Sequence, residues 1–322
     1  MPLWLFPRLT RDRSPLQGDS LVKALPGLKP WAVLLSHFMA ENRTMNRQVK
    51  QVSLARIVRD SALELLLTFL MLFGVISIVR WVIGPSPISQ MIPEIHAELL
   101  IVGVAVAILI AGLIMSPAGK MTGGHMNPAI SLAMWRFGVF PGVGVTPYIV
   151  AQLLGSILGG VAARLVWGPV VAQAPVAYAA LQPGPGWSTL LLFAAETVSM
   201  GIIVLLVGFC LAVARLAPFV PWIVGGAIGI AIALLGTSTG GSVNPARQFG
   251  PATLSGQTHF LWVYLLAPMA GALLAAWVRQ AIQQHRNVLT HRLCGTHEDG
   301  SALSGLKTNR DSSEDQQLSR RD

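Results

Sequence analysis

The segment Gly124-His125-Met126-Asn127-Pro128-Ala129 recurs 117 residues later as Gly241-Ser242-Val243-Asn244-Pro245-Ala246. In each copy an Asn-Pro pair follows a glycine-containing turn and precedes a short apolar run, residues 129–137 or 246–254. Asn is a favoured helix N-cap, and Pro suits the first helical position because an amide hydrogen there has no intrahelical acceptor. Each copy therefore predicts the start of a helix that is too short to cross a membrane.

The composition around these segments is that of a membrane protein. The 322 residues are 53% hydrophobic and 11% charged, whereas a soluble domain carries about a quarter charged residues. Residues 60–278 hold only 6 of the 23 Lys and Arg residues. This distribution excludes a soluble enzyme, because a fold of that length in water needs a polar exterior.

Six apolar segments are long enough to cross a bilayer as helices, which takes about 20 residues each. They are residues 61–83, 97–117, 145–168, 188–210, 219–238 and 260–282. Six spans place both termini on one side, and 20 of the 23 basic residues are counted on that side. The positive-inside rule then predicts a basic cytoplasmic extension (1–59), a membrane domain (60–282) and a disordered cytoplasmic tail (283–322).

The internal repeat extends into the spans. Tyr148-x-x-Ala151-x-x-x-Gly155 recurs as Tyr264-x-x-Ala267-x-x-x-Gly271, and an early span of each half carries an acid, Glu64 or Glu196. Each half contains three spans, and an odd number means that the halves are inverted relative to each other. The sequence therefore predicts an all-α membrane protein, with six transmembrane helices and two re-entrant half-helices that enter from opposite faces.

The paired motifs resemble those of the aquaporin, or major intrinsic protein, family over residues 60–282. The resemblance rests on the following residues: Gly123-Gly124-His125-x-Asn127-Pro128-Ala129, Asn244-Pro245-Ala246-Arg247, Phe249-Gly250-Pro251-Ala252, Glu64 and Glu196. It implies an aquaporin-like channel domain in a homotetramer of the plasma membrane, which passes small neutral solutes and water. It also implies a pore motif made of Asn127, Pro128, Ala129, Asn244, Pro245 and Ala246. Glu64 and Glu196 would accept hydrogen bonds from the two loops, and we expect His125 to hold its own loop.

The family's narrowest filter takes one residue about 20 before the first motif Asn, and residues 12 before, 3 before and 3 after the second. These positions are Ala107, Ile232, Gly241 and Arg247, and a one-residue slip would place Val106 or Ile108 at the first. Water-selective aquaporins usually have Phe and His at the first two positions. The present set resembles the nodulin-like intrinsic proteins, which pass solutes of the glycerol, urea, boric acid and arsenous acid class. Arg247 and two opposed helix N-termini would disfavour cations.

Two alternative functions stay open from the sequence. A proton- or ion-coupled secondary transporter also uses inverted repeats and broken helices, and Glu64, Glu98 and Glu196 are its candidate coupling groups. The other alternative is a strictly water-selective channel.

We predict no catalytic residue, because no nucleophile and base are paired at a recognisable spacing, and no cofactor. No nucleic-acid partner is expected, since the basic excess flanks the membrane domain. No metal site is expected, because no predicted helix or strand brings together the candidate ligands in the tail, His285, His291, Cys294 and His297.

Overall fold

The computed structural model describes residues 53–92, 94–282, 287–297, 301 and 303. Within these residues, six helical segments are long and apolar enough to cross a membrane, as the sequence predicts. They are α3 (Leu54–Val82), α5 (Ile95–Met115), α8 (Gly142–Trp167), α9 (Thr189–Cys210), α10 (Val220–Leu235) with the preceding 3-10 turn η4 (Ala217–Phe219), and α12 (Leu261–Ile282). Ser53 caps the first of these helices by accepting a hydrogen bond from the Arg56 amide, so α3 begins before the predicted start at residue 61.

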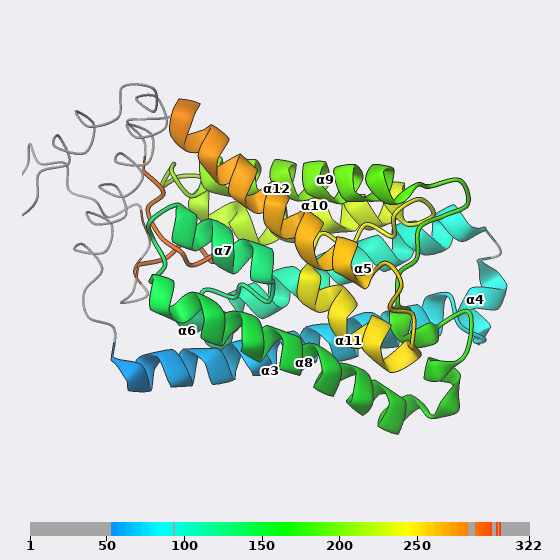
Figure 1. Ribbon diagram of the computed structural model, residues 1–322. Helices are drawn as coiled ribbons and strands as arrows, with labels where there is room; N and C mark the ends of the chain where they lie inside the picture. Colours follow the sequence, from blue (N-terminus) through cyan, green and yellow to red (C-terminus); the bar gives the residue numbers. More distant parts are fainter. Residues whose placement is uncertain (1–52, 93, 283–286, 298–300, 302, 304–322) are drawn as a thin grey trace, which may run out of the picture. The chain divides into compact units, whose positions relative to one another are not determined.

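The shorter helices lie in the connections between the spans. They are α4 (Pro87–Met91), α6 (Pro117–Thr122), α7 (Pro128–Arg136) and α11 (Pro245–Ser255), with the 3-10 turns η2 (Pro169–Ala172) and η3 (Ala177–Ala179). Figure 1 shows α7 and α11 approaching from opposite ends of the bundle and meeting near its middle. These are the two half-helices that the repeated motif predicts.

The packing of the helices follows the inverted repeat. Helix α3 packs chiefly against α8, and its counterpart α9 packs chiefly against α12. Helices α5 and α10 pack against each other, while each half-helix lies against the last span of the opposite half, α7 on α12 and α11 on α8. The two halves are therefore interleaved, and the half-helices are enclosed by protein.

Glycines allow the closest helix contacts. A Cβ on Gly155 or Gly159 of α8 would overlap the carbonyl oxygen of Leu65 or Phe69 in α3, and a Cβ on Gly271 of α12 would overlap that of Thr197 in α9. Gly103 of α5 faces Gly229 of α10 in the same way. Such contacts between backbones replace the hydrophobic driving force, which is weak between helices in lipid.

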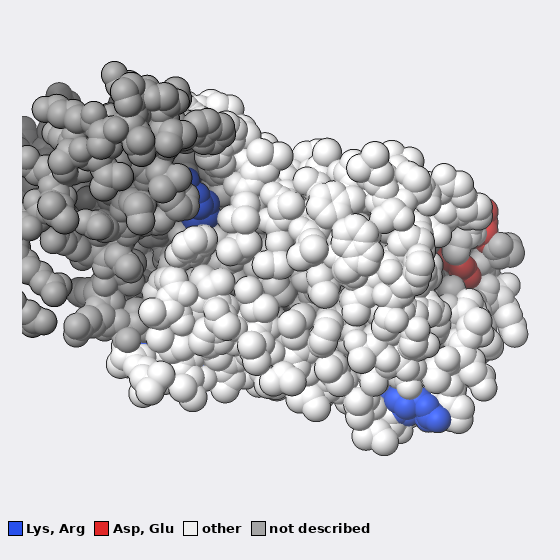
Figure 2. Space-filling view, viewed as in Figure 1, with Lys and Arg blue, Asp and Glu red and all other residues white. Residues whose placement is uncertain are grey.

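The outer surface matches a lipid environment. Large apolar side chains such as Leu165, Leu190 and Leu234 are exposed on α8, α9 and α10. On the face seen in Figure 2, the middle of the described surface shows neither acidic nor basic residues. An apolar belt of this kind would be unstable in water and is expected of helices that contact hydrocarbon.

Part of the C-terminal region differs from the sequence prediction of a disordered tail from residue 283. Residues 287–297 are a packed segment, in which Val288 and Leu293 are buried. The Leu289 amide donates to the Leu211 carbonyl at 3.1 Å, and the Leu293 amide donates to the Gly123 carbonyl at 3.0 Å. The polar composition predicted disorder, but apolar residues within this segment find a buried site on the bundle.

The glycine contacts generate a stability test. Gly155→Ala places a methyl group against the Leu65 carbonyl, so we expect a loss of about 1–3 kcal/mol and a lower melting temperature in detergent. Gly112→Ala in α5 is the matched control, because a Cβ there meets nothing within 4 Å. The control should be neutral or slightly stabilising, since Ala is the better helix former. Equal melting temperatures for the two variants would contradict the packing described.

Candidate pore

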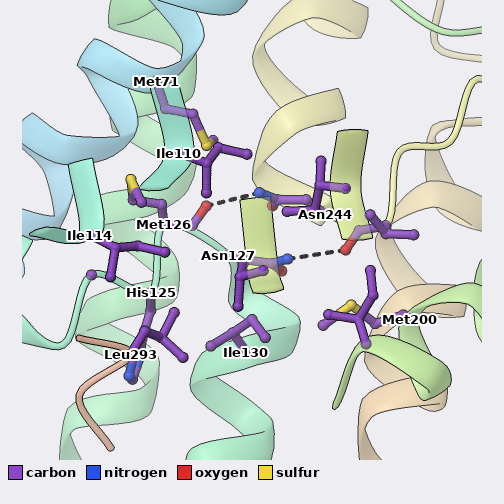
Figure 3. Close-up of a pocket in the computed structure, with 15 residues that line it drawn as sticks. Met71, Ile110, Ile114, His125, Met126, Asn127, Ile130, Met200, Asn244 and Leu293 are labelled. Atoms are coloured by element: carbon purple, nitrogen blue, oxygen red, sulfur yellow. Dashed lines mark hydrogen bonds between the residues drawn. The ribbon is translucent and has the colours of Figure 1, made fainter. Parts of the chain in front are cut away.

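The two motif asparagines begin the half-helices and also tie them together. Asn127 Oδ1 accepts from the Ala129 amide at 2.9 Å, and Asn244 Oδ1 accepts from the Ala246 amide at 2.9 Å. Across the junction, Asn127 Nδ2 donates to the Val243 carbonyl at 3.0 Å, and Asn244 Nδ2 donates to the Met126 carbonyl at 2.9 Å (Figure 3). Pro128 and Pro245 occupy the first helical positions. The positive ends of both helix dipoles therefore meet at this junction.

Glu64 holds the first loop, as the resemblance implies. Its Oε1 accepts from Thr122 Oγ1 at 2.7 Å and from the His125 amide at 2.9 Å. Its Oε2 accepts from the Met126 amide at 2.8 Å and from Gln152 Nε2 at 2.9 Å. The carboxylate is fully buried, and all four bonds use it as an acceptor. It satisfies loop donors that water would otherwise have to reach.

Glu196 repeats this arrangement in the second loop. Its two oxygens accept from the Ser242 amide at 3.2 Å and from the Val243 amide at 2.8 Å. A pair of tyrosines, Tyr148 and Tyr264, completes the symmetry, since their hydroxyls donate to the carbonyls of Thr122 and Thr239 at 2.9 and 2.7 Å. The sequence repeat contains this tyrosine pair, but only the structure shows what it does.

Met126 and Val243 sit at the centre of these contacts. Both have a positive φ, 47° and 44°, which is unfavourable for a residue with a side chain and most of all for a β-branched one. Each gives its amide hydrogen to the glutamate of its own half and its carbonyl oxygen to the asparagine of the other. These bonds hold the strained backbone in place.

A cavity runs past this junction and is lined mainly by apolar side chains. The part shown in Figure 3 is bounded by Met71 of α3, Ile110 and Ile114 of α5, and Met200 of α9, together with Asn127, Asn244 and other residues. Each asparagine amide nitrogen carries two hydrogens, and the described residues accept only one of them. One N–H of each asparagine thus remains for a solute in the cavity.

Farther along lies a second part of the cavity, which shares Met71, Ile110 and Asn244 with the first. It contains three of the four predicted filter residues. Ile232 of α10, Gly241 and Arg247 line it, together with Val106 of α5. Ala107 does not line it, because its side chain and carbonyl pack against Gly229 and Gly225 of α10. Val106, the neighbour that a one-residue slip in counting would give, lines this part of the cavity instead.

Arg247 has both a structural contact and a place on the cavity wall. Its Nη1 donates to the Ala179 carbonyl at 2.6 Å in turn η3 and is 3.4 Å from Gln248 Oε1. Gln248 Oε1 in turn accepts from the Leu181 amide at 3.0 Å, and Gln248 Nε2 donates to the Leu181 carbonyl at 2.8 Å. The connection between α8 and α9 therefore fixes the guanidinium group, a link that the sequence does not reveal.

His125 holds its loop, and it also reaches the tail. Its Nδ1 lies 3.1 Å from Ser131 Oγ in α7, and its Nε2 lies 3.1 Å from the carbonyl oxygen of His291. The second copy of the motif has Ser242 at this position, and the Ser242 hydroxyl bonds within its own loop, to the Asn244 carbonyl at 3.2 Å. The two halves therefore differ here, because the His125 side chain reaches beyond its own loop and the Ser242 side chain does not.

The described residues contain no cluster of three or more His, Cys, Asp or Glu side chains that could hold a metal ion.

Sequence reasoning missed several residues of the cavity wall. Four of them are apolar residues on apolar spans: Met71, Val75, Ile110 and Ile228. Nothing in their local sequence separates a side chain that faces the pore from one in the core. The same holds for Leu293 of the tail, which lines the part of the cavity in Figure 3.

Comparison with known proteins agrees with this geometry. Residues 45–279 match the sequence profile of the family described as Major intrinsic protein. The chain belongs to the major intrinsic protein family. A probable aquaporin, AqpM, of Archaeoglobus fulgidus is 38% identical over 188 residues, which are 55% of this chain and 74% of that protein. Nodulin-26 of Glycine max is 31% identical over 176 residues, 54% of this chain and 63% of that protein.

Two further matches describe the family relationship. Aquaporin NIP2-1 of Zea mays is 36% identical over 170 residues, 52% of this chain and 55% of that protein, so the chain spans about half the length of that relative. The solved structure of the aquaglyceroporin from Plasmodium falciparum is similar in fold, with a TM-score of 0.56 at 22% identity, over 70% of this chain and 96% of that one. Major intrinsic proteins are channels and not enzymes, and this member is a passive channel for water and small solutes.

The bonds to Glu64 generate a second test. Glu64→Ala leaves the His125 and Met126 amides without an acceptor, which costs about 1–3 kcal/mol of stability for each buried group. Glu64→Gln keeps one acceptor oxygen but replaces the other by an NH2 group, which then faces hydrogen-bond donors. We expect the melting temperature to fall in the order Glu, Gln, Ala. Glu98→Ala is the control, since Glu98 is also an acid in a span but lies in the first turn of α5 and not at the pore loops. If the Glu64 variants melt like the parent and lose only solute flux, the carboxylate acts on the solute and not on the loop.

Proposed function

We propose that this channel passes small neutral solutes of the glycerol, urea, boric acid and arsenous acid class, together with water. The observation that supports this most directly is the wall around Arg247. Val106, Ile232 and Gly241 face the same part of the cavity, and its described lining includes no aromatic ring and no histidine. Aliphatic groups and a glycine leave more width than a filter built from two rings, and they make the wall more apolar.

The polar groups in the cavity suit a solute that accepts hydrogen bonds and carries no charge. Arg247, Asn127 and Asn244 contribute N–H donors to the lining, while most of the other lining side chains are those of Val, Ile and Met. A polyol or a weak acid in its neutral form can bond to the donors and place its less polar side on the aliphatic groups. Cations meet an arginine and two positive helix ends in sequence, which raises the barrier to them.

The contacts of the buried carboxylates argue against ion coupling. Glu64 and Glu196 are 0% and 1% exposed, and neither is among the residues that line the cavity. Their oxygens are engaged by loop amides and side-chain donors. A coupling group needs access to the transported ion, so the passive mode is the one that these contacts support.

We further propose that the protein is a homotetramer in the plasma membrane with both termini in the cytoplasm. The membership in the major intrinsic protein family supports the tetramer. The concentration of Lys and Arg in the flanking regions supports the orientation, since basic residues favour the cytoplasmic side.

The filter can be tested by rebuilding a narrow ring. Val106→Phe with Ile232→His adds two rings to the lumen opposite Arg247, so the ratio of glycerol to water permeability in reconstituted vesicles should fall by at least about tenfold. Ile108→Phe is the matched control, because Ile108 lies on the same helix but is 57% exposed on its outer side. A double variant that assembles normally and keeps the parental ratio would remove Val106 and Ile232 from the constriction.

The charge barrier has its own test. Arg247→Val removes the cation from the cavity wall, so vesicles holding this variant should become leakier to sodium or protons than vesicles holding the parent. Because the change also breaks the bond to the Ala179 carbonyl, assembly must first be confirmed by size-exclusion chromatography. A parent protein that already conducts sodium well above empty vesicles would contradict the proposed exclusion of cations.

A further inference from the structure

The tail segment, residues 287–297, contributes one side chain, Leu293, to the end of the cavity that lies away from Arg247. Leu293 is 1% exposed and lines the cavity beside His125, Ile114 and Ile130. Figure 3 shows Leu293 beside His125, at the end of the view opposite Met71. We call this end, bounded by Ile114, His125, Ile130 and Leu293, the tail-side mouth.

Hydrogen bonds fix the tail segment at this mouth. The Leu293 amide donates to the Gly123 carbonyl at 3.0 Å, and His125 Nε2 lies 3.1 Å from the His291 carbonyl oxygen. Both partners belong to the loop that leads to Asn127. The segment is therefore bound to the same loop that positions the pore motif, and it is bound through its own backbone.

The segment is also folded to fit its site. Gly295 has a φ of 69°, and a Cβ there would overlap the carbonyl oxygen of Ala217 in η4. Within the segment, Arg292 Nη1 donates to the His297 carbonyl at 2.7 Å and Thr290 Oγ1 donates to the Thr296 carbonyl at 2.9 Å. These bonds form a compact turn that presents Leu293 to the cavity.

From this placement we propose that the tail segment is an intramolecular plug, which closes the tail-side mouth by inserting Leu293 and opens it by leaving. A leucine side chain in an apolar passage excludes water as well as larger solutes, so the docked state is non-conducting for both. The inference rests on the channel function of the family and not on the proposed solute class, because water flux alone can report it.

Two features favour a plug that can be released. His291 Nδ1 and Arg292 Nε are buried, and no described residue forms a hydrogen bond with either atom. Burial, together with the nearby charges of His125, Arg292 and Arg56, lowers the pKa of His291 well below its usual range. Buried donors and acceptors without partners make docking less favourable than its apolar contacts alone would make it, so both states can be populated.

The test uses the full chain in reconstituted vesicles and reads water flux by stopped-flow light scattering. Leu293→Ala removes the side chain from the passage and shifts the docking equilibrium toward the free segment, so water flux per channel should rise by at least about tenfold. Asn287→Ala is the matched control, because Asn287 lies in the same segment but is exposed and does not line the cavity. Equal flux for the parent and Leu293→Ala would overturn the proposal.

A second variant separates docking from the effect of the leucine itself. Gly295→Val should expel the segment, since its side chain would overlap Ala217 and oppose the positive φ. Cys294, buried at 8% exposure, reports docking through its rate of alkylation in a Cys210→Ala background. We expect Gly295→Val to speed alkylation and to raise water flux together. Faster alkylation with unchanged water flux would show that the segment leaves without opening the pore, which also overturns the proposal.

Discussion

The backbone of two residues, Met126 and Val243, links the two halves of this channel. Each residue donates its amide hydrogen to a buried glutamate of its own half and accepts, through its carbonyl oxygen, a hydrogen bond from an asparagine of the other half. A bilayer offers no water to satisfy these groups. The half-helices can therefore begin inside the bundle only because Glu64, Glu196 and the two asparagines supply hydrogen-bond partners for these backbone groups.

The properties of the pore follow from this junction. Opposed helix starts bring two positive dipole ends and two asparagine amides to one place, and the spans around it contribute aliphatic walls. The two glutamates bond to the loops and do not line the cavity. Among the described residues that line it near Ile232, Arg247 is the one that carries a charge. The same bonds that satisfy the fold thus leave a pathway suited to neutral molecules.

The sequence alone predicts most of the fold, because the repeated motif carries strong local signals. Asn-Pro predicts helix starts, the apolar lengths predict spans, and the odd number of spans in each half predicts inversion. The choice between Ala107 and Val106 depends on the rotation of α5 against α10, which the glycine contacts decide. The packing of residues 287–297 depends on a cavity that exists only in the folded bundle, so composition predicts disorder there.

The central claim is that an apolar, cation-excluding pathway carries neutral solutes passively. The most direct measurement is the permeability of vesicles holding the parent protein to glycerol, urea, boric acid and water, each with and without an imposed proton or sodium gradient. Ratios between solutes cancel the fraction of channels that are open. We expect glycerol and boric acid to pass alongside water at rates that do not change with either gradient. Uptake that requires a gradient, or water flux with glycerol excluded, would contradict the account.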